Sequence, residues 1–413
     1  MTLDLVKIAG RLPELVERAR RERAAAEDRA GRALDLLRRA AARPDEFERR
    51  IRGAETSWTL ALPHSGRMDR GVAPPPPPLN YAALAVDGSS IDVDRNLPIS
   101  CYVLNFGWMR IQYGADAAAH ANTDVELEPT GEELYLRDAD DPSRESAIAG
   151  AVLGVVRGVR ELAKLAELAE QLCPSDRPLL ALVDGNLALW NLDKRDIPAR
   201  IAEELKTGPR GALQALNRLR TLTEAGRVVF SGYVSHTGAG NLAHSLRLLA
   251  CPAEPRVVCR ACPGRAANLR PCDEAGLADD AELMRLVLDP WERSAVFKAH
   301  SSRQAPVVET WYEEEGHEIV FFYLNAGGEI ARVELPVWMA EDPVRLDLLH
   351  ALLVQQARQG GQYPVALQEA HEQAVISTGD RASFTALIAR ECELSGIPWL
   401  ISSKALSKQT RVI

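Results

Sequence analysis

The chain has 413 residues and a formal net charge of −9, with 46% hydrophobic and 26% charged residues. This composition is typical of a folded globular protein with two or three domains, or with one large domain and additions. A protein covered in positive charge is excluded. Local basic segments are compatible with the negative sum, because the distribution of charge matters more than its total.

The sequence also bears on where the protein is found. No apolar run approaches the ~18 residues that a membrane helix needs. The N-terminal residues have no continuous apolar stretch after a basic start, so they do not resemble a secretory signal. Seven cysteines, an odd number, are typical of a reducing compartment. We therefore expect a cytoplasmic protein without a membrane partner.

Residues 3–52 have the pattern of helices, with leucine and alanine at three- and four-residue steps and charged residues between them. Residues 18–52 are dense in arginine and could contact phosphate, but the helical pattern with acid–base pairs favours a solvated helical hairpin or coiled-coil arm over a direct DNA contact. The five prolines at 74–78 must be extended and stiff, and they indicate a spacer rather than an SH3-type ligand. We expect residues 1–78 to form a helical arm and a polyproline spacer.

Two apolar segments of strand length end in the same way. Residues 81–86 run into Asp87 and Gly88, and residues 179–183 run into Asp184 and Gly185. Asp-Gly is ordinary turn chemistry. A buried strand that ends in Asp also holds a metal ligand rigidly, and two such strands can place two carboxylates around one divalent cation. The residues downstream favour the metal site, which is typical of phosphodiester chemistry.

Further elements are predicted in chain order after the first Asp-Gly segment. Residues 98–114 predict a strand antiparallel to the Asp87 strand, and residues 145–172 predict one long helix. After the Asp184 strand, the pattern predicts a helix at about 198–225, a strand at 226–235, a helix at 241–250, a three-stranded meander at 307–312, 318–324 and 330–335, helices at 343–359, 363–376 and 381–395, and a strand at 399–401. This order indicates an α/β domain over residues 79–408, with a mixed sheet, flanking helices and a C-terminal helical extension.

Two of the predicted helices carry further candidate site residues. Glu145 lies in the first turn of the predicted 145–172 helix, where the helix dipole and a cap at Ser143 also favour an acid. Pro364 suits the first position of a helix, so Tyr363 flanks the helix start and His371 lies two turns further on. His371 is a candidate metal ligand or proton carrier, although a lone helix histidine is commonly structural.

These four elements together resemble the NurA family of nucleases, which process DNA ends alongside the HerA hexameric translocase. The resemblance covers about residues 80–408, with matching order and spacing of the motifs. It rests on Ala85–Ser89, Arg144-Glu145, Leu182–Leu187, Tyr363-Pro364, Ala370-His371 and the basic ending Ser403–Ala405.

The resemblance implies an RNase H-like core and a homodimer with a central channel. It implies a Mn²⁺- or Mg²⁺-dependent 5′–3′ exonuclease on single- and double-stranded DNA, with endonuclease activity on single strands. In this interpretation Asp87, Glu145, Asp184 and His371 are the metal ligands, and Tyr363 lines the same catalytic site. Hard oxygen ligands suit either cation, and the histidine shifts the preference toward Mn²⁺.

One position departs from the family pattern. A Ser-Lys pair is expected after the strand at 226–235, but the chain has Ser235-His236. A lysine holds phosphate as a fixed cation, whereas a neutral histidine does so weakly. This substitution favours an alternative in which the protein is a catalytically weak clamp that binds DNA ends and docks on the translocase. A third alternative is an RNase H-like enzyme that acts on RNA or on DNA junctions.

Four of the seven cysteines are clustered in sequence, within a predicted insertion at residues 250–290. They are Cys251, Cys259, Cys262 and Cys272. Four thiolates could bind structural Zn²⁺ or an iron–sulfur cluster. The spacings are irregular, with a single CxxC, and they also fit a loop insertion with incidental thiols.

Overall fold

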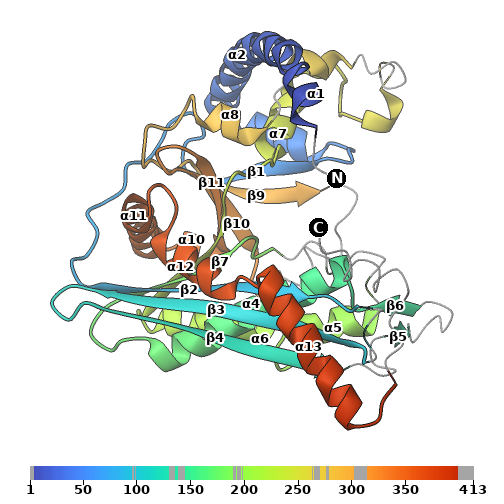
Figure 1. Cartoon of the computed structure of the whole chain (residues 1–413). Coiled ribbons are helices and arrows are strands. Elements are labelled where there is room, and N and C mark those ends of the chain that lie inside the picture. The colour runs from blue at the N-terminus through green and yellow to red at the C-terminus, as the bar shows by residue number, and fades with distance from the viewer. Residues whose placement is uncertain are drawn as a thin grey trace. The chain divides into compact units, whose positions relative to one another are not determined.

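The computed structural model in Figure 1 shows the chain from residue 1 to residue 413. It describes all residues except 1–3, 95, 96, 98, 130–134, 138–144, 189–191, 193–196, 198, 263, 265–269, 276–278, 302–313 and 399–413. The chain forms two compact units. The first unit contains residues 1–75, 234–314 and 318–341, and the second contains residues 76–233, 315–317 and 342–413.

The second unit is built on strands in the order β4-β3-β2-β7-β8. β2 (Tyr81–Ile91) pairs antiparallel with β3 (Cys101–Tyr113), and β3 pairs antiparallel with β4 (Ala118–Pro129). On its other edge β2 pairs parallel with β7 (Leu179–Asp184), which pairs parallel with β8 (Val228–Val234). β2 and β7 are apolar runs with almost every residue buried, as expected for strands covered on both faces. The predicted mixed α/β sheet is therefore confirmed, as is the antiparallel partner of the Asp87 strand.

Helices cover both faces of these strands (Figure 1). α4 (Ala151–Leu172) packs on β2 and β7 and against α6 (Ala212–Glu224). α12 (Val365–Ala374) packs on β2 and β3. The remaining elements of the second unit are α5 (Ala199–Thr207), α11 (Pro343–Gln359), α13 (Thr378–Leu394) and the short pair β5 (Tyr135–Arg137) and β6 (Glu145–Ala147).

The first unit combines an antiparallel set of strands with the N-terminal helices. Its strands run in the order β1 (Thr59–Ser65), β9 (Val296–Ser301), β10 (Ile319–Asn325) and β11 (Ile330–Pro336). Its helices are α1 (Leu5–Ala9), α2 (Leu12–Ala42), α3 (Pro44–Arg52), α7 (Asn241–Ala250), α8 (Asp280–Met284) and α10 (Val337–Ala340), with 3₁₀ turns at Cys259–Ala261 and Pro271–Ala275. α2 packs against α7 and α8, so the N-terminal helices share a core with residues 234–341.

A buried carboxylate organises this core. Asp280 accepts hydrogen bonds from the backbone N–H groups of Leu242 and Ala243, at 3.0 and 2.7 Å, and from the hydroxyl of Tyr323. These N–H groups belong to the first turn of α7, where an intrahelical acceptor is missing. Burial raises the pKa of Asp280 to about 6, although the hydrogen bonds favour the charged form. Asp280 thus ties α7, α8 and β10 together.

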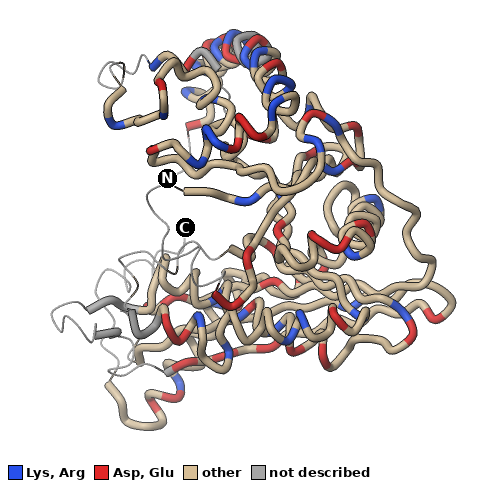
Figure 2. The backbone as a smooth tube through the Cα atoms, turned by 180° about the vertical axis from the view of Figure 1, so that it is seen from behind, with Lys and Arg blue, Asp and Glu red and all other residues tan. Residues whose placement is uncertain are grey.

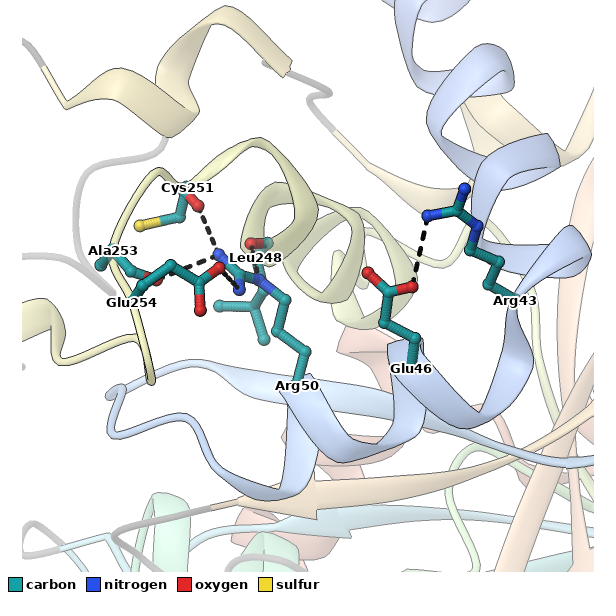
Figure 3. A network of polar contacts seen from close by, with 7 residues as sticks. All are labelled: Arg43, Glu46, Arg50, Leu248, Cys251, Ala253 and Glu254. Atoms are coloured by element: carbon teal, nitrogen blue, oxygen red, sulfur yellow. Dashed lines mark hydrogen bonds and ion pairs between the residues drawn. The ribbon is translucent and has the colours of Figure 1, made fainter.

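The arginines of the N-terminal helices are paired with acceptors inside the first unit. Arg50 of α3 donates to the carbonyl oxygens of Leu248, Cys251 and Ala253, and it pairs with Glu254 at 2.9 Å (Figure 3). These carbonyls lie at the C-terminal end of α7, where unpaired acceptors and the helix dipole favour a cation. Arg50 therefore has a structural role.

The arginines further along the N-terminal helices alternate with acids. Blue and red segments are interleaved along α2 in Figure 2. Arg18 lies 2.8 Å from Glu22, and Arg21 lies 3.4 Å from Glu17. Exposed pairs of this kind contribute little stability, so they indicate a solvated helix surface.

Several sequence predictions differ from the structure in detail. The helix expected at 198–225 is divided into α5 and α6 around Gly208–Gly211, because glycine is a poor helix former. β1 and β4 were not predicted. β4 is mostly exposed and half of its residues are polar, so it lacks the apolar run of a buried strand. A three-stranded meander was expected, and β9 is the third strand beside β10 and β11. The strand expected at 307–312 lies outside the described residues. The strand expected at 399–401 and the basic ending at 403–405 also lie outside them. Within the described part of the chain, no helix is both long and apolar enough to cross a membrane.

Gly107 provides a test of how α12 is seated. It lies opposite Asp87 in the β2–β3 ladder, and a Cβ atom there would come closer than 3.0 Å to the backbone of Gln373 and Ala374. We predict that Gly107→Ala lowers the free energy of unfolding by about 1–3 kcal/mol, because α12 has to move away from the sheet. Urea unfolding followed by circular dichroism measures this change.

The matched control is Gly154→Ala in α4, where a Cβ atom meets open space. Alanine is favoured over glycine in a helix by about 1 kcal/mol, so this variant should be at least as stable as the wild type. Equal stability of the Gly107→Ala variant and the wild type would contradict the close packing of α12.

Candidate active site

The two Asp-Gly segments are brought side by side by parallel strand pairing. Val86 of β2 is paired with Val183 of β7, so Asp87 and Asp184 follow at neighbouring positions. Asp87 is buried and Asp184 is partly buried. The strands therefore hold both carboxylates rigidly at one place in the second unit.

The two glycines that follow have different roles. β7 ends at Asp184, and Gly185 has a φ of +102°, which makes it a true turn residue. β2 instead continues to Ile91 through Gly88. A Cβ atom at position 88 would overlap a carboxylate oxygen of Glu161, so Gly88 leaves space for that side chain. Turn chemistry therefore explains only the second Asp-Gly pair.

Tyr363 and His371 lie at the same carboxylates. His371 Nδ1 is 2.7 Å from Asp87 Oδ2, and the His371 side chain is 59% exposed. Tyr363, just before α12, makes a side-chain hydrogen bond with Asp184, and its ring meets Tyr233 edge-on at 5.5 Å. The structure thus brings four of the five predicted site residues together.

α12 is held in place at both ends. Asn105 Nδ2 donates to the carbonyl oxygen of Ala374 at 2.9 Å, and the Ser89 hydroxyl donates to the same oxygen. Near the start of the helix, Gln356 Oε1 accepts from the backbone N–H of Ala366 at 3.1 Å. The Gln356 amide nitrogen in turn bonds to the Tyr113 hydroxyl at 2.9 Å. The position of His371 is therefore set by several buried contacts.

The prediction that Glu145 lies in the first turn of a long helix is wrong. Glu145 begins the strand β6, and its side chain lies outside the described set. The helix α4 starts at Ala151, after Gly150 in a positive-φ conformation of +55°. The capping signal at Ser143 was therefore not the helix start, and the structure gives no geometric support for Glu145 as a helix ligand.

A different helix carboxylate, Glu161 of α4, faces the two aspartates. Its residue exposure is 6%, and burial raises its pKa to about 8, with a further contribution from the negative charges of Asp87 and Asp184. Arg157 opposes this shift, with Nε 3.1 Å from Glu161 Oε1, but that oxygen makes no well-aligned hydrogen bond. An acid on the buried face of an amphipathic helix was the sequence signal that could have identified it.

Asp184 has a similar electrostatic environment. Burial raises its pKa, and the charge of Asp87 raises it further, against the hydrogen bond from Tyr363. Desolvation and repulsion between the carboxylates therefore oppose the charged forms of Glu161 and Asp184.

These acids have the donor chemistry of a divalent-cation site. Mg²⁺ and Mn²⁺ prefer carboxylate oxygens, and a cation would favour the ionised forms that burial and repulsion oppose. Among the described residues, however, no three or more His, Cys, Asp or Glu side chains lie close enough together to hold a metal ion. Glu161 Oε1 lies beside Arg157 Nε without a well-aligned hydrogen bond, so this oxygen can accept a further ligand.

The four clustered cysteines do not support a metal site. All four are free thiols that line a pocket of about 530 Å³ in the first unit. They fall outside any metal-holding group of the described residues. The predicted Zn²⁺ or iron–sulfur site at Cys251, Cys259, Cys262 and Cys272 is therefore unsupported.

His236 also lies in the first unit. Its side chain is 82% exposed, and Nε2 lies 3.3 Å from a carboxylate oxygen of Glu329. Its φ is +45°, in the left-handed region. At the position of the expected lysine, the chain therefore presents an imidazole beside an acid.

The comparison with protein families identifies the chain. Residues 81–376, well over half of the sequence, match the NurA domain. This range contains Asp87, Glu161, Asp184, Tyr363 and His371. The chain therefore belongs to the NurA family of nucleases, and the resemblance seen in the sequence is confirmed.

Solved structures similar to this chain include three of NurA. One is the crystal structure of the NurA nuclease from Sulfolobus solfataricus, with 12% identity and a TM-score of 0.49, covering 95% of this chain and 98% of that chain. A structure of NurA with manganese has 14% identity and a TM-score of 0.31, covering 77% and 90%. A further structure of NurA has 13% identity and a TM-score of 0.35, covering 86% and 97%. No curated protein gave a significant match.

Glu161 predicts how stability depends on pH in the metal-free protein. The carboxyl group has a pKa of 4.5 when unperturbed and about 8 in the folded state, so between these values the folded state binds more protons than the unfolded state. By linkage, the free energy of unfolding falls as the pH rises through this range. Urea unfolding in the presence of EDTA, at several values between about pH 5 and about pH 8, measures the slope.

We expect Glu161→Gln to weaken this pH dependence, because the amide stays neutral. Glu167→Gln changes an acid of α4 that is 41% exposed at its side chain, and it should keep the wild-type slope. If the Glu161→Gln and Glu167→Gln variants have the same slope, Glu161 does not titrate as described.

Proposed function

We propose that the protein is a metal-dependent deoxyribonuclease that hydrolyses phosphodiester bonds at Asp87, Glu161, Asp184, Tyr363 and His371. The observation that carries this proposal is the buried Glu161 carboxyl group, with a pKa of about 8, beside two aspartates at neighbouring strand positions. Such a cluster is costly to ionise without a cation, and perturbed acids of this kind are typical of catalytic sites. Glu161 takes the place that the sequence assigned to Glu145.

The fold proposal is an RNase H-like core. It is supported by the strand order β4-β3-β2-β7-β8, in which an antiparallel meander is followed by two strands parallel to the first. In the sequence, α4 lies between the β2–β4 meander and β7. It carries Glu161, which lies near the carboxylates of Asp87 and Asp184.

The residues divide the chemical work in this proposal. Asp87, Glu161 and Asp184 would hold the cation, and His371 is a further candidate ligand. The imidazole would favour Mn²⁺ slightly over Mg²⁺. The chemistry that such a cation would supply is activation of water and stabilisation of the leaving oxygen of the phosphodiester. Asp87 orients the His371 ring through Nδ1, which leaves Nε2 available to carry a proton. Tyr363 fixes the orientation of Asp184.

Family membership supports the finer proposals. We propose 5′–3′ exonuclease activity on single- and double-stranded DNA, endonuclease activity on single strands, and a role in DNA end resection with a HerA-type hexameric translocase. The proposed assembly is a homodimer in the cytoplasm.

One observation favours a second candidate function. His236 stands beside Glu329 where the family pattern has lysine, so this position supplies no fixed positive charge for phosphate. A DNA clamp of the same fold, with weak catalysis and docking on the translocase, is the alternative.

A cleavage assay separates the two functions. We expect the purified protein with Mn²⁺ to degrade end-labelled single-stranded DNA, and Asp184→Ala to reduce the rate about 100-fold or more, because it removes a proposed metal ligand. The matched control is Asp116→Ala, an exposed aspartate of the same unit paired with Arg177 at 3.7 Å, which should cleave at the wild-type rate. Denaturing gel electrophoresis of the products gives both the rate and the polarity.

DNA binding without cleavage by the wild type, with Mn²⁺ present, would favour the clamp. Equal cleavage by the wild type and Asp184→Ala would contradict the assigned site.

A further inference from the structure

A pocket of about 360 Å³ adjoins the carboxylates on the α4 side of the second unit. Glu161 and Asp184 form part of its wall, and Arg157 and Asn186 add a cation and an amide. Gly154 also lines it, and the Cβ position of Gly154 is open space. A volume in this range accommodates a small ligand of roughly nucleotide size rather than a folded partner.

The ion pair between Arg157 and Glu161 does not have the best geometry. Arg157 Nε is 3.1 Å from Glu161 Oε1, and this contact opposes the rise in the pKa of Glu161, but these two buried atoms are not aligned for a good hydrogen bond. Arginine binds carboxylates most strongly through two parallel hydrogen bonds, which this contact lacks. The order along the helix, with the base four residues before the acid, is also the weaker one. The Arg157 side chain remains 39% exposed on the pocket wall.

A cation and Arg157 are both attracted by the carboxylate of Glu161. A cation held by this carboxylate therefore weakens the attraction between Glu161 and the guanidinium. Arg157 then carries a less compensated charge on the wall of a polar pocket that Glu161 and Asp184 also line. A phosphate group of a nucleic acid can accept two parallel hydrogen bonds from the Arg157 guanidinium, which Glu161 does not do here.

We propose that this pocket is a nucleotide-binding subsite, in which Arg157 exchanges its contact with Glu161 for a phosphate of the DNA strand when a divalent cation binds. This inference rests on the proposed nuclease function and assigns the phosphate-binding cation of its site. Asn186, which follows the Gly185 turn, faces the sugar or base of the same nucleotide.

The exchange is tested by two binding titrations, with thymidine 5′-monophosphate as a probe that cannot be cleaved. Isothermal titration calorimetry gives the affinity for Mn²⁺ alone and the affinity for the nucleotide at saturating Mn²⁺. For Arg157→Gln we expect tighter Mn²⁺ binding, by about threefold or more, because a competing cation is removed. We expect about tenfold weaker nucleotide binding, as for the loss of a hydrogen bond to a charged group.

Arg160→Gln is the matched control. Arg160 lies on the same helix, half-exposed, and outside the pocket wall. This variant should bind Mn²⁺ and the nucleotide as the wild type does. Arg157→Lys should recover part of the nucleotide affinity, since it restores the charge without the planar fork.

In the exchange model, Arg157→Gln binds Mn²⁺ more tightly and the nucleotide more weakly. A purely structural ion pair does not predict these opposite changes. If Arg157→Gln weakens the binding of both Mn²⁺ and nucleotide, Arg157 only supports Glu161 and the proposal is overturned. Behaviour identical to Arg160→Gln also overturns it, and leaves the nuclease proposal intact provided that the wild type cleaves DNA. Absence of Mn²⁺ binding by the wild type would instead contradict the metal-dependent function and the exchange together.

Discussion

The parallel register between β2 and β7 is the constraint on which the site depends. Pairing of Val86 with Val183 fixes Asp87 and Asp184 at the same level of the sheet, and a shift of one residue would turn one carboxylate to the opposite face. Two glycines beside Asp87 complete the arrangement. Gly107 allows α12 to approach one face, and Gly88 admits Glu161 from the other. The arrangement of these side chains thus depends on two positions that carry no side chain.

The electrostatics of the second unit follow from this geometry. Burial raises the pKa values of Glu161 and Asp184, and the negative charge of Asp87 raises both further. Arg157 and His371 offset only part of this cost, from opposite sides of the group. The charged form of this site is therefore only partly stabilised by the protein's own residues.

Much of this arrangement could be predicted from the sequence. The apolar runs before Asp87 and Asp184 predict buried strands, and Pro364 predicts the helix that carries His371. Glu161 was missed because the helix start was placed at a local capping signal, whereas Gly150 and the tertiary packing set it six residues later, at Ala151. Likewise, the division into two units depends on contacts between segments far apart in the sequence, which local patterns do not show.

The chain order of the site has a consequence for protein synthesis. Asp87 and His371 are separated by 284 positions, and residues 234–314 and 318–341, which belong to the other unit, are made between them. A ribosome that has translated both strand carboxylates has not yet made α12, so the nascent chain lacks His371 and Tyr363. Domains fold as they emerge, but this site is completed only near the end of translation. Chains that end before α12 therefore lack two of the five residues gathered at the site.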